Sequence, residues 1–506
     1  MNQFHTRSNR KALRIGFAAT CGLMAFAAAA PAQGQCAPQE QAKLIASDAA
    51  PNDLFGYSIA ISGDTAVVGA DVDDHAGGND AGSAYVFVRV GGVWTEQAKL
   101  IASDAAAGDK FGYSVAVSGD TAVVGAESDT HAGGASAGSA YVFVRSGTDW
   151  IQQAKLIASD AAVADLFGVS VALSGDTAVV GAFFEDNAGG SEAGSAYVFV
   201  RSGTVWTQQT KLIASDAAVA DLFGTSVALS GDTAVVGANS DDNTGGANAG
   251  SAYVFVRSGT IWTEQAKLTA SDAAVSDLFG VSVAISGDTA LVGANNDDNA
   301  FDADAGSAYI FVRSGVAWTQ QARLVASDAA ATDNFGISVA LSGDTALVGA
   351  WQNDNLGGAD AGSAYVFIRS GVVWTQQAKL IASDAAATDI FGVSVALSGD
   401  TAVVGARADD NAGGSDAGSA YTFDLGCDDD EDGIVNANDG CPNDPNKSAP
   451  GACGCGVSDV DANADGTPDC SDAAACGTCA QGVMPAMAMC LSLLMWARRR
   501  RFHGGS

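Results

Sequence analysis

The chain has little of the chemistry that enzymes usually need. Only four histidines occur in 506 residues; two lie near the chain ends, and His75 and His131 occupy equivalent loops. No cysteine lies between Cys36 and Cys427, so this long middle part has no His/Cys set of the kind that binds zinc. Nucleophile-elbow and phosphate-loop motifs are also missing. We therefore expect no catalytic residues, although the many carboxylate pairs leave a glycosidase-like site open.

Positive charge is scarce as well. Lys and Arg number 24 against 58 Asp and Glu, which gives a formal net charge of −34. Residues 1–32 and 476–506 contain cations but no acidic residue, so the part between them is more acidic still. Such a body does not bind nucleic-acid phosphates by charge and suits solubility, divalent cations or cationic partners. Hydrophobic residues make up 48%, enough for a core, so disorder is not expected.

The N-terminus has the pattern of a secretory signal peptide. Basic residues precede an apolar run over 15–30, and Ala30-Pro31-Ala32 resembles a cleavage site. The alternative is a membrane anchor, but the apolar run is shorter than the roughly 20 residues that a spanning helix needs. We assign residues 1–32 to a signal peptide and expect a secreted protein.

Seven copies of a 56-residue unit follow one another without insertion or deletion. Each copy repeats the same skeleton, which in the first reads Phe55-Gly56, then Ser62-Gly63-Asp64-Thr65, then Gly69-Ala70, an acidic Gly-rich stretch and Ala81–Phe87. Such regularity is typical of solenoids and propellers. The copies start at Gln41, Gln97, Gln153, Gln209, Gln265, Gln321 and Gln377.

Each unit predicts four β-strands, over Phe55–Ser62, Thr65–Ala70, Gly82–Arg89 and Trp94–Ser103, with Gly63-Asp64 as a two-residue type II′ hairpin. Seven such units predict an all-β fold, a seven-bladed β-propeller of four-stranded blades over residues 33–426. A β-solenoid is the alternative.

The incomplete units at the two ends favour the closed ring. The seventh copy stops after its third strand, Gly418–Phe423, while an orphan fourth strand, Glu40–Ser47, precedes the first copy. Pairing them in one blade removes two exposed sheet edges. Cys36 and Cys427 flank these two strands, where other blades have a hairpin, so we predict a disulfide between them. Pairing elsewhere, or free thiols, remains the alternative.

The combination of Phe55-Gly56 with Gly69-Ala70, repeated through Phe391-Gly392 with Gly405-Ala406, resembles the FG-GAP repeat. The resemblance covers Gln41 to about Leu425. That family includes the propeller heads of integrin α subunits and many bacterial surface proteins. Its calcium-binding members carry an Asp-rich loop between the first two strands, where this chain has only Ser-Gly-Asp-Thr, so that calcium site is not carried over.

Most carboxylates fall in the links from strand two to strand three and from strand four to the next blade, which alternating strand directions place on one face. In the first repeat these are Asp71, Asp73, Asp74 and Asp80, with Asp48 and Asp53 in the other link. We expect either a solvated acidic rim or weak binding of a cation such as Ca²⁺, or of a partner.

The residue after Gly-Ala varies from copy to copy, within near-identical sequence. Phe183, Phe184, Trp351 and Arg407 at this site are candidate partner contacts, because aromatic residues and Arg carry much interface energy. Drift in a tolerant loop is the alternative. The residues at the varying position are Asp71, Glu127, Phe183, Asn239, Asn295, Trp351 and Arg407.

Residues 427–475 predict a small calcium- and disulfide-stabilised segment; an acidic linker is the alternative. Two Asp/Asn-rich loops place oxygen ligands at the offsets that wrap Ca²⁺, with Gly433 and Gly466 at the sharp turns, and the segment resembles thrombospondin type 3 repeats. The predicted Ca²⁺ ligands are Asp428, Asp430, Asp432, Asn436 and Asp439 in the first loop and Asp461, Asn463, Asp465, Asp469 and Asp472 in the second. Pairing among Cys441, Cys453, Cys455, Cys470, Cys476 and Cys479 stays open.

Residues 476–506 combine Cys476-Gly477-Thr478-Cys479, an apolar run over 483–497 and an Arg cluster at 498–501. This resembles bacterial C-terminal sorting tails, and the Arg cluster is expected to stay cytoplasmic. We therefore expect a secreted protein held at the bacterial cell surface or outer envelope, touching the membrane through this tail only. We expect a monomeric propeller that binds an extracellular protein or glycan, with a structural envelope role as the alternative.

Overall fold

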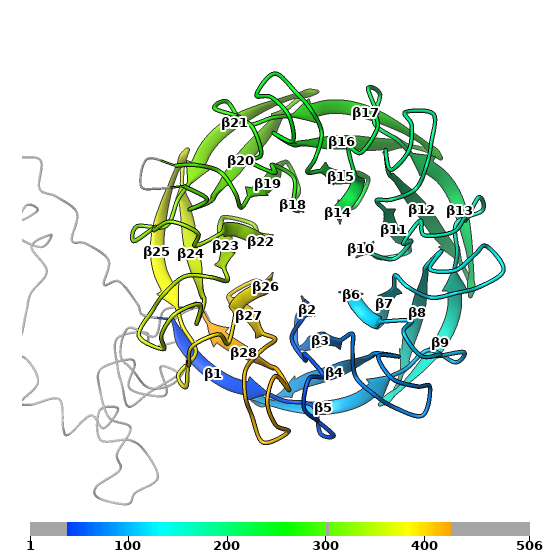
Figure 1. Ribbon diagram of the computed structural model, residues 1–506, viewed down its shortest axis with the longest axis vertical. Coiled ribbons are helices and arrows are strands. Elements are labelled where there is room, and N and C mark those ends of the chain that lie inside the picture. The colour runs from blue at the N-terminus through cyan, green and yellow to red at the C-terminus, as the bar shows by residue number, and fades with distance from the viewer. Residues whose placement is uncertain (1–37, 300–302, 427–506) are drawn as a thin grey trace, which may run out of the picture. The chain divides into compact units, whose positions relative to one another are not determined.

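The computed structural model describes residues 38–299 and 303–426, and every regular element in these residues is a β-strand. The 28 strands form seven sheets of four, which surround a common axis as blades (Figure 1). The predicted all-β, seven-bladed propeller is therefore confirmed. Within the described ranges there is no helix with the length and hydrophobicity needed to cross a bilayer.

The strands fall into four sets, from the axis outward. The first strands are β2 (Ser58–Ser62), β6 (Phe111–Ser118), β10 (Val171–Ser174), β14 (Phe223–Ser230), β18 (Ser282–Ser286), β22 (Phe335–Ser342) and β26 (Phe391–Ser398). The second strands are β3 (Thr65–Ala70), β7 (Thr121–Ala126), β11 (Thr177–Ala182), β15 (Thr233–Ala238), β19 (Thr289–Ala294), β23 (Thr345–Ala350) and β27 (Thr401–Ala406). The third strands are β4 (Ser83–Val90), β8 (Ser139–Ser146), β12 (Ser195–Ser202), β16 (Ser251–Ser258), β20 (Ser307–Ser314), β24 (Ser363–Ser370) and β28 (Ser419–Asp424). The fourth strands are β5 (Val93–Leu100), β9 (Asp149–Leu156), β13 (Val205–Leu212), β17 (Ile261–Leu268), β21 (Ala317–Leu324), β25 (Val373–Leu380) and β1 (Gln39–Leu44).

The innermost hairpin forms as predicted. Ser62 pairs with Thr65 around a two-residue turn, and Gly63 has a φ of +56°, which a type II′ turn requires at its first central position. The fourth strand ends earlier than predicted, at Leu100. Ser103 leaves the ladder because its backbone N–H donates to the side chain of Gln152 in the next blade.

Adjacent blades meet through their backbones near the axis. We number the blades along the chain, from blade 1 (β2–β5) and blade 2 (β6–β9) to blade 7 (β26–β28 with β1). The Gly112 carbonyl of blade 2 lies so close to Gly69 of blade 1 that a Cβ built on Gly69 would stand 2.0 Å from it. Ser58 Oγ donates to the same carbonyl at 2.7 Å. Glycine at the second strand and Ser at the first therefore let the two sheets approach closely, and the same contact repeats at the other blade interfaces.

The hydrophobic core lies between blades rather than within them. Phe111, fully buried, packs edge-on against Tyr141 and Phe143 of its own blade, with ring centroids 5.5 and 5.9 Å apart. The same cluster includes Val67 and Val86 from the preceding blade. Seven equivalent clusters fill the seven interfaces, so closure of the ring lets every blade pack against two neighbours.

The first and last strands of the chain close the ring, as the incomplete repeats predicted. Strand β1 pairs antiparallel with β28 in the sheet order β1-β28-β27-β26, and the two lie side by side in Figure 1. Ser394 Oγ donates to the carbonyl of Gly56 at 2.7 Å, so the seam between blade 7 and blade 1 resembles the others.

Several sequence predictions fall outside the described residues. These are the signal peptide at 1–32, both cysteines of the predicted Cys36–Cys427 disulfide, the calcium ligands from Asp428 to Asp472 and the tail at 476–506. They stay predictions.

We predict that Cys36 and Cys427 form a disulfide that clamps the closing blade. The described register ends with Gln39 opposite Asp424; Cys36 lies three residues before Gln39 and Cys427 three residues after Asp424 in the sequence. The chain-entropy model gives an upper bound of about 6 kcal/mol for so long a loop. Peptide mapping under non-reducing conditions should recover the two cysteines in one linked peptide.

Substitution provides the second measurement. Replacing both residues by Ser should lower the denaturation midpoint of the propeller, whereas replacing Cys453 and Cys455 should leave it unchanged. Alkylation of both Cys36 and Cys427 in the folded, non-reduced protein would contradict the disulfide.

Candidate functional site

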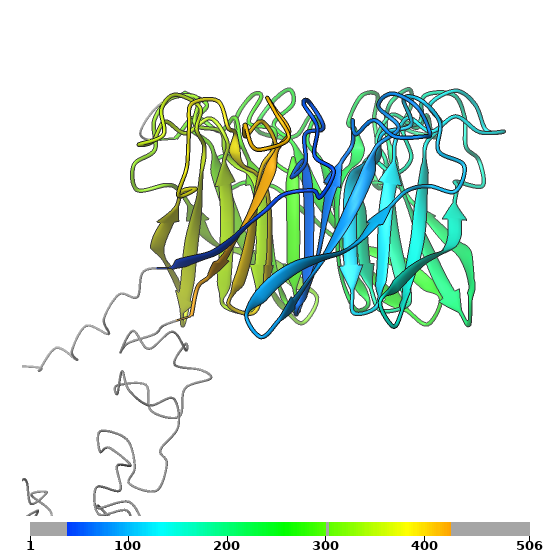
Figure 2. The same ribbon diagram turned by 90° about the horizontal axis from the view of Figure 1, so that it is seen from below.

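The two long links of every blade emerge on one face of the ring, which we call the loop face (Figure 2). The links come from neighbouring blades and bond to each other. Asn52 N–H donates to the Ser415 carbonyl at 2.9 Å, and Phe55 N–H donates to the Ala417 carbonyl at 3.0 Å. The carboxylates that these links carry therefore gather on one side, as the alternating strand directions predicted.

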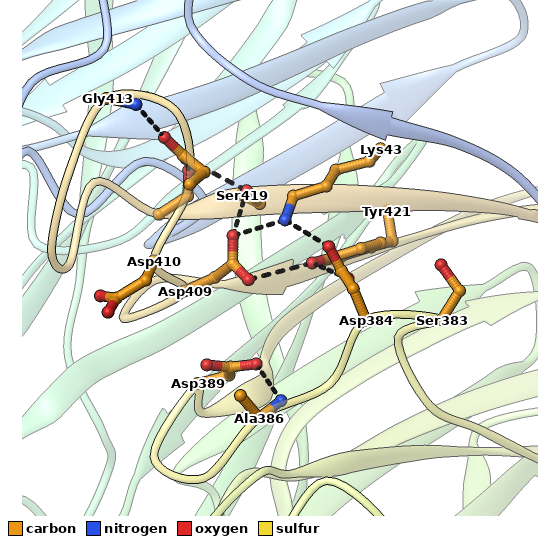
Figure 3. Close-up of polar contacts among 12 residues, drawn as sticks. Lys43, Ser383, Asp384, Ala386, Asp389, Asp409, Asp410, Gly413, Ser419 and Tyr421 are labelled. Atoms are coloured by element: carbon orange, nitrogen blue, oxygen red, sulfur yellow. Dashed lines mark hydrogen bonds and ion pairs between the residues drawn. The ribbon is translucent and has the colours of Figure 1, made fainter.

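Some of these carboxylates do not belong to a solvated rim, because they form ion pairs within the protein. Figure 3 shows Lys43 of β1 between Asp384, from the link that enters blade 7, and Asp409, from a link inside it. The Lys43 Nζ lies 2.7 Å from Asp384 Oδ2 and 2.8 Å from Asp409 Oδ2. Tyr421 OH donates to Asp384 at 2.8 Å, and Ser419 Oγ donates to Asp409 at 2.6 Å. We call this group the blade-link cluster.

Protonation equilibria reflect this pairing. Burial raises the pKa of Asp384, but the hydrogen bonds from Lys43 and Tyr421 outweigh it and hold the pKa below its ordinary value. Burial lowers the pKa of Lys43, yet its bonds to Asp384 and Asp409 raise it above the usual range. Both charges are therefore retained at neutral pH, and the cluster joins two blades.

The ion pair between the cation and the buried acid recurs around the ring with one exception. Blade 6 has Asn353 where the other blades have a buried acid, so Lys379 keeps only Asp328 as an ion-pair partner. Asn353 donates instead to Asp333 at 2.9 Å. The other pairings between the cation and the buried acid are Lys43–Asp409, Lys99–Asp73, Lys155–Asp129, Lys211–Glu185, Lys267–Asp241 and Arg323–Asp297.

Each link between blades carries a second buried acid, and at Asp165 and Asp389 this acid lines a pocket between neighbouring links. In blade 7 the pocket measures about 420 Å³ and is lined by Asp384, Asp389, Asp409, Asp410 and Asp416. Burial raises the pKa of Asp389 to about 6, and the neighbouring carboxylates add to this effect. Asp384 and Asp409 are already paired with Lys43, and no group of three His, Cys, Asp or Glu side chains in the described ranges is arranged to hold a metal ion.

The predicted partner contacts lie at the inner ends of the second strands, on the loop face. The Arg407 guanidinium stacks over Trp351, 5.5 Å from the ring centroid. Phe183 and Phe184 contact each other with ring centroids 4.1 Å apart, and Phe184 is 36% exposed. The structure thus joins Trp351 with Arg407 and pairs the two phenylalanines in blade 3.

Sequence reasoning missed residues that extend this cluster. Arg407 also stacks over Tyr57, 5.3 Å from its centroid, and Tyr57 contacts Tyr113 at 5.0 Å between ring centroids. Both tyrosines directly follow Phe-Gly, where the other copies have Val, Thr or Ile. A comparison of the copies at this second position would have found them.

Two acids next to these rings are deeply buried. Asp71 is 3% exposed, and burial raises its pKa to about 6. Burial raises the pKa of Glu127 to about 7, although Lys110 Nζ lies 3.9 Å from its carboxylate. Asp71 Oδ1 is buried without a hydrogen-bond partner. We call the set around these residues the axial cluster: Trp351, Arg407, Tyr57, Tyr113, Asp71, Glu127 and Lys110.

The exception in blade 6 gives a matched test of the blade-link cluster. Lys155→Ala leaves the carboxylate of Asp129, whose side chain is 4% exposed, without its ion-pair partner. Lys379→Ala removes no ion pair to a buried carboxylate. Because an unpaired buried charge is costly, we expect Lys155→Ala to lose about 2 kcal/mol more stability than Lys379→Ala. Urea denaturation of both variants measures the difference. Equal losses would show that the buried acid does not depend on its cation.

Comparison with protein families confirms the resemblance seen in the repeats. The FG-GAP repeat profile matches the chain seven times, once for each blade. The matched residues are 38–87, 94–143, 150–199, 206–255, 262–311, 318–367 and 374–423. Comparison with curated proteins gives no match. The seven matches cover well over half of the chain, and each spans the fourth strand of one blade and the first three strands of the next, so the chain belongs to the FG-GAP repeat family.

Proposed function

We propose that this protein is a secreted, surface-anchored binding or adhesion scaffold without catalytic activity, which presents the loop face of its propeller to an extracellular partner. The observation that carries the proposal is the contrast between the strands, whose sequences are nearly constant, and the loop face, whose residues vary from blade to blade. The second strand has the same length and nearly the same residues in all seven blades, yet the residue that follows it ranges from Asp71 to Phe183, Trp351 and Arg407. Constant strands that hold variable loop residues are what a binding scaffold requires.

The anchoring part of the proposal rests on the sequence outside the described residues. The signal peptide at 1–32 supports export, and the tail at 476–506 supports retention at the bacterial surface. The segment at 427–475 would join the propeller to this tail as a stalk stiffened by Ca²⁺ at its Asp and Asn ligands.

A structural envelope component without a specific ligand is the alternative. The aromatic side chains that reach the surface of the loop face favour binding, since Phe184 is 36% exposed and the half-buried Trp351 and Arg407 lie next to each other. Such residues supply much of the energy of protein interfaces.

The binding function predicts a face-specific loss. A variant with Phe183, Phe184, Trp351 and Arg407 replaced by Ala should bind intact cells or extracellular material at least ten times more weakly, because several contact side chains are removed. Binding of the labelled, purified chain to cells measures this.

The control changes the opposite face. Val90, Val93, Val372 and Val373 are 73, 61, 71 and 57% exposed near the hairpins between the third and fourth strands, and their replacement by Ala should leave binding unchanged. Equal binding by both variants would favour the structural alternative.

The calcium segment has a separate test. Without Ca²⁺ its carboxylates repel one another, so EDTA should make residues 427–475 sensitive to protease while the propeller stays intact. Mass spectrometry of the fragments locates the cuts. Asp432→Ala together with Asp465→Ala should be cleaved even in Ca²⁺. Identical digestion with and without EDTA would contradict the metal sites.

A further inference from the structure

We propose that the axial cluster and the adjoining amide side chains form a binding site for a neutral saccharide. This inference rests on the proposed binding function and names the site and the ligand class. The cluster is continuous over four blades: Trp351 contacts Arg407, Arg407 contacts Tyr57, and Tyr57 contacts Tyr113.

The strand ends of blades 4 to 6 carry amides and a hydroxyl. Asn295 Nδ2 donates to Asn334 Oδ1 at 2.8 Å, and Asn334 Nδ2 donates to Gln352 Oε1 at 2.8 Å. Thr225 Oγ1 donates to Asn239 Oδ1 at 3.0 Å. The strand ends therefore carry aromatic rings and charges along the arc of blades 6, 7, 1 and 2 and neutral hydrogen-bonding groups along the arc of blades 4 and 5, with Phe183 in blade 3 between them.

Three buried atoms in these two arcs lack a hydrogen-bond partner. Asp71 Oδ1 and Asn295 Oδ1 are acceptors, and Trp351 Nε1 is a donor. Asp71 is 3% exposed and Asn295 is 7% exposed, so neither residue is simply solvated. Buried polar groups left unpaired cost free energy, and a ligand with both donors and acceptors would pair them after a small movement of the side chains.

The charges of the axial cluster decide among ligand classes. Asp71, with a pKa of about 6, is mostly ionised at neutral pH and would repel an anion, and Glu127, with a pKa of about 7, is partly ionised and adds to this repulsion. Lys110 and Arg407 would repel a cation. A neutral saccharide carries hydroxyl groups that both donate and accept, and its C–H face stacks on aromatic rings such as Tyr113 and Trp351. The presence of both acids and cations thus favours a neutral polyhydroxylated ligand over a basic peptide or an acidic polysaccharide.

The test uses the full secreted chain and immobilised neutral oligosaccharides of glucan, mannan, galactan and xylan type, beside alginate and oligolysine as charged probes. We expect binding to at least one neutral saccharide and to neither charged probe. Trp351→Ala and Tyr113→Ala should each weaken that binding tenfold or more, and Asp71→Ala should do the same by removing the buried acceptor.

Trp318→Ala is the matched control, because its half-buried indole lies on the outermost strand β21. It should keep full affinity, with folding of all variants verified by circular dichroism. Absence of neutral-saccharide binding, or binding that survives both Trp351→Ala and Asp71→Ala, overturns the inference. Binding of oligolysine or alginate alone, lost when loop-face residues are replaced, also overturns it but leaves the proposed binding function standing.

Discussion

The close approach of two backbones at each blade seam is the constraint on which the rest of the structure depends. Gly69 has no room for a side chain because the Gly112 carbonyl of the next blade occupies that space, and Ser58 satisfies the same carbonyl with a hydrogen bond. The residues of the FG-GAP motif therefore describe an interface between repeats. Any side chain at Gly69 would push two sheets apart and disturb the whole ring, because each blade is held only by its neighbours.

The blade-link clusters solve a second problem, that of an acidic chain whose links crowd together. In six blades the cation neutralises one buried and one exposed carboxylate from two different links, as Lys99 does with Asp73 and Asp48. The chain has 24 cationic and 58 acidic residues. One cation lies at each interface, where an unpaired buried charge would lower the stability of the fold most. The acids farther out on the loop face stay in water.

Much of the fold follows from the repeat pattern, because seven equal units with a missing strand at one end and an extra one at the other leave one economical closure. The repeat pattern does not predict which carboxylates are buried and which are exposed. Asp73 and Asp74 are adjacent and chemically identical, yet Asp73 is 3% exposed and bonded to Lys99, whereas Asp74 lies at the surface and accepts from the Asp80 N–H. Which of the two turns inward depends on contacts between blades, which spacing along one chain does not reveal. A comparison of the copies would single out Tyr57 and Tyr113, but only the closed ring places Tyr57 next to Arg407 and Tyr113 next to Tyr57.

The position of β28 within its sheet has a mechanical consequence. The strand lies between β1 and β27, and its last residue, Asp424, is at the end of blade 7 remote from the loop face. Tension applied through the C-terminal side of the chain, against a load on the loop face, would run along β28 and strain its hydrogen bonds to both neighbours in parallel. Such shear loading resists rupture better than peeling an edge strand one bond at a time, so the closure that completes the ring also makes the propeller suited to transmitting force.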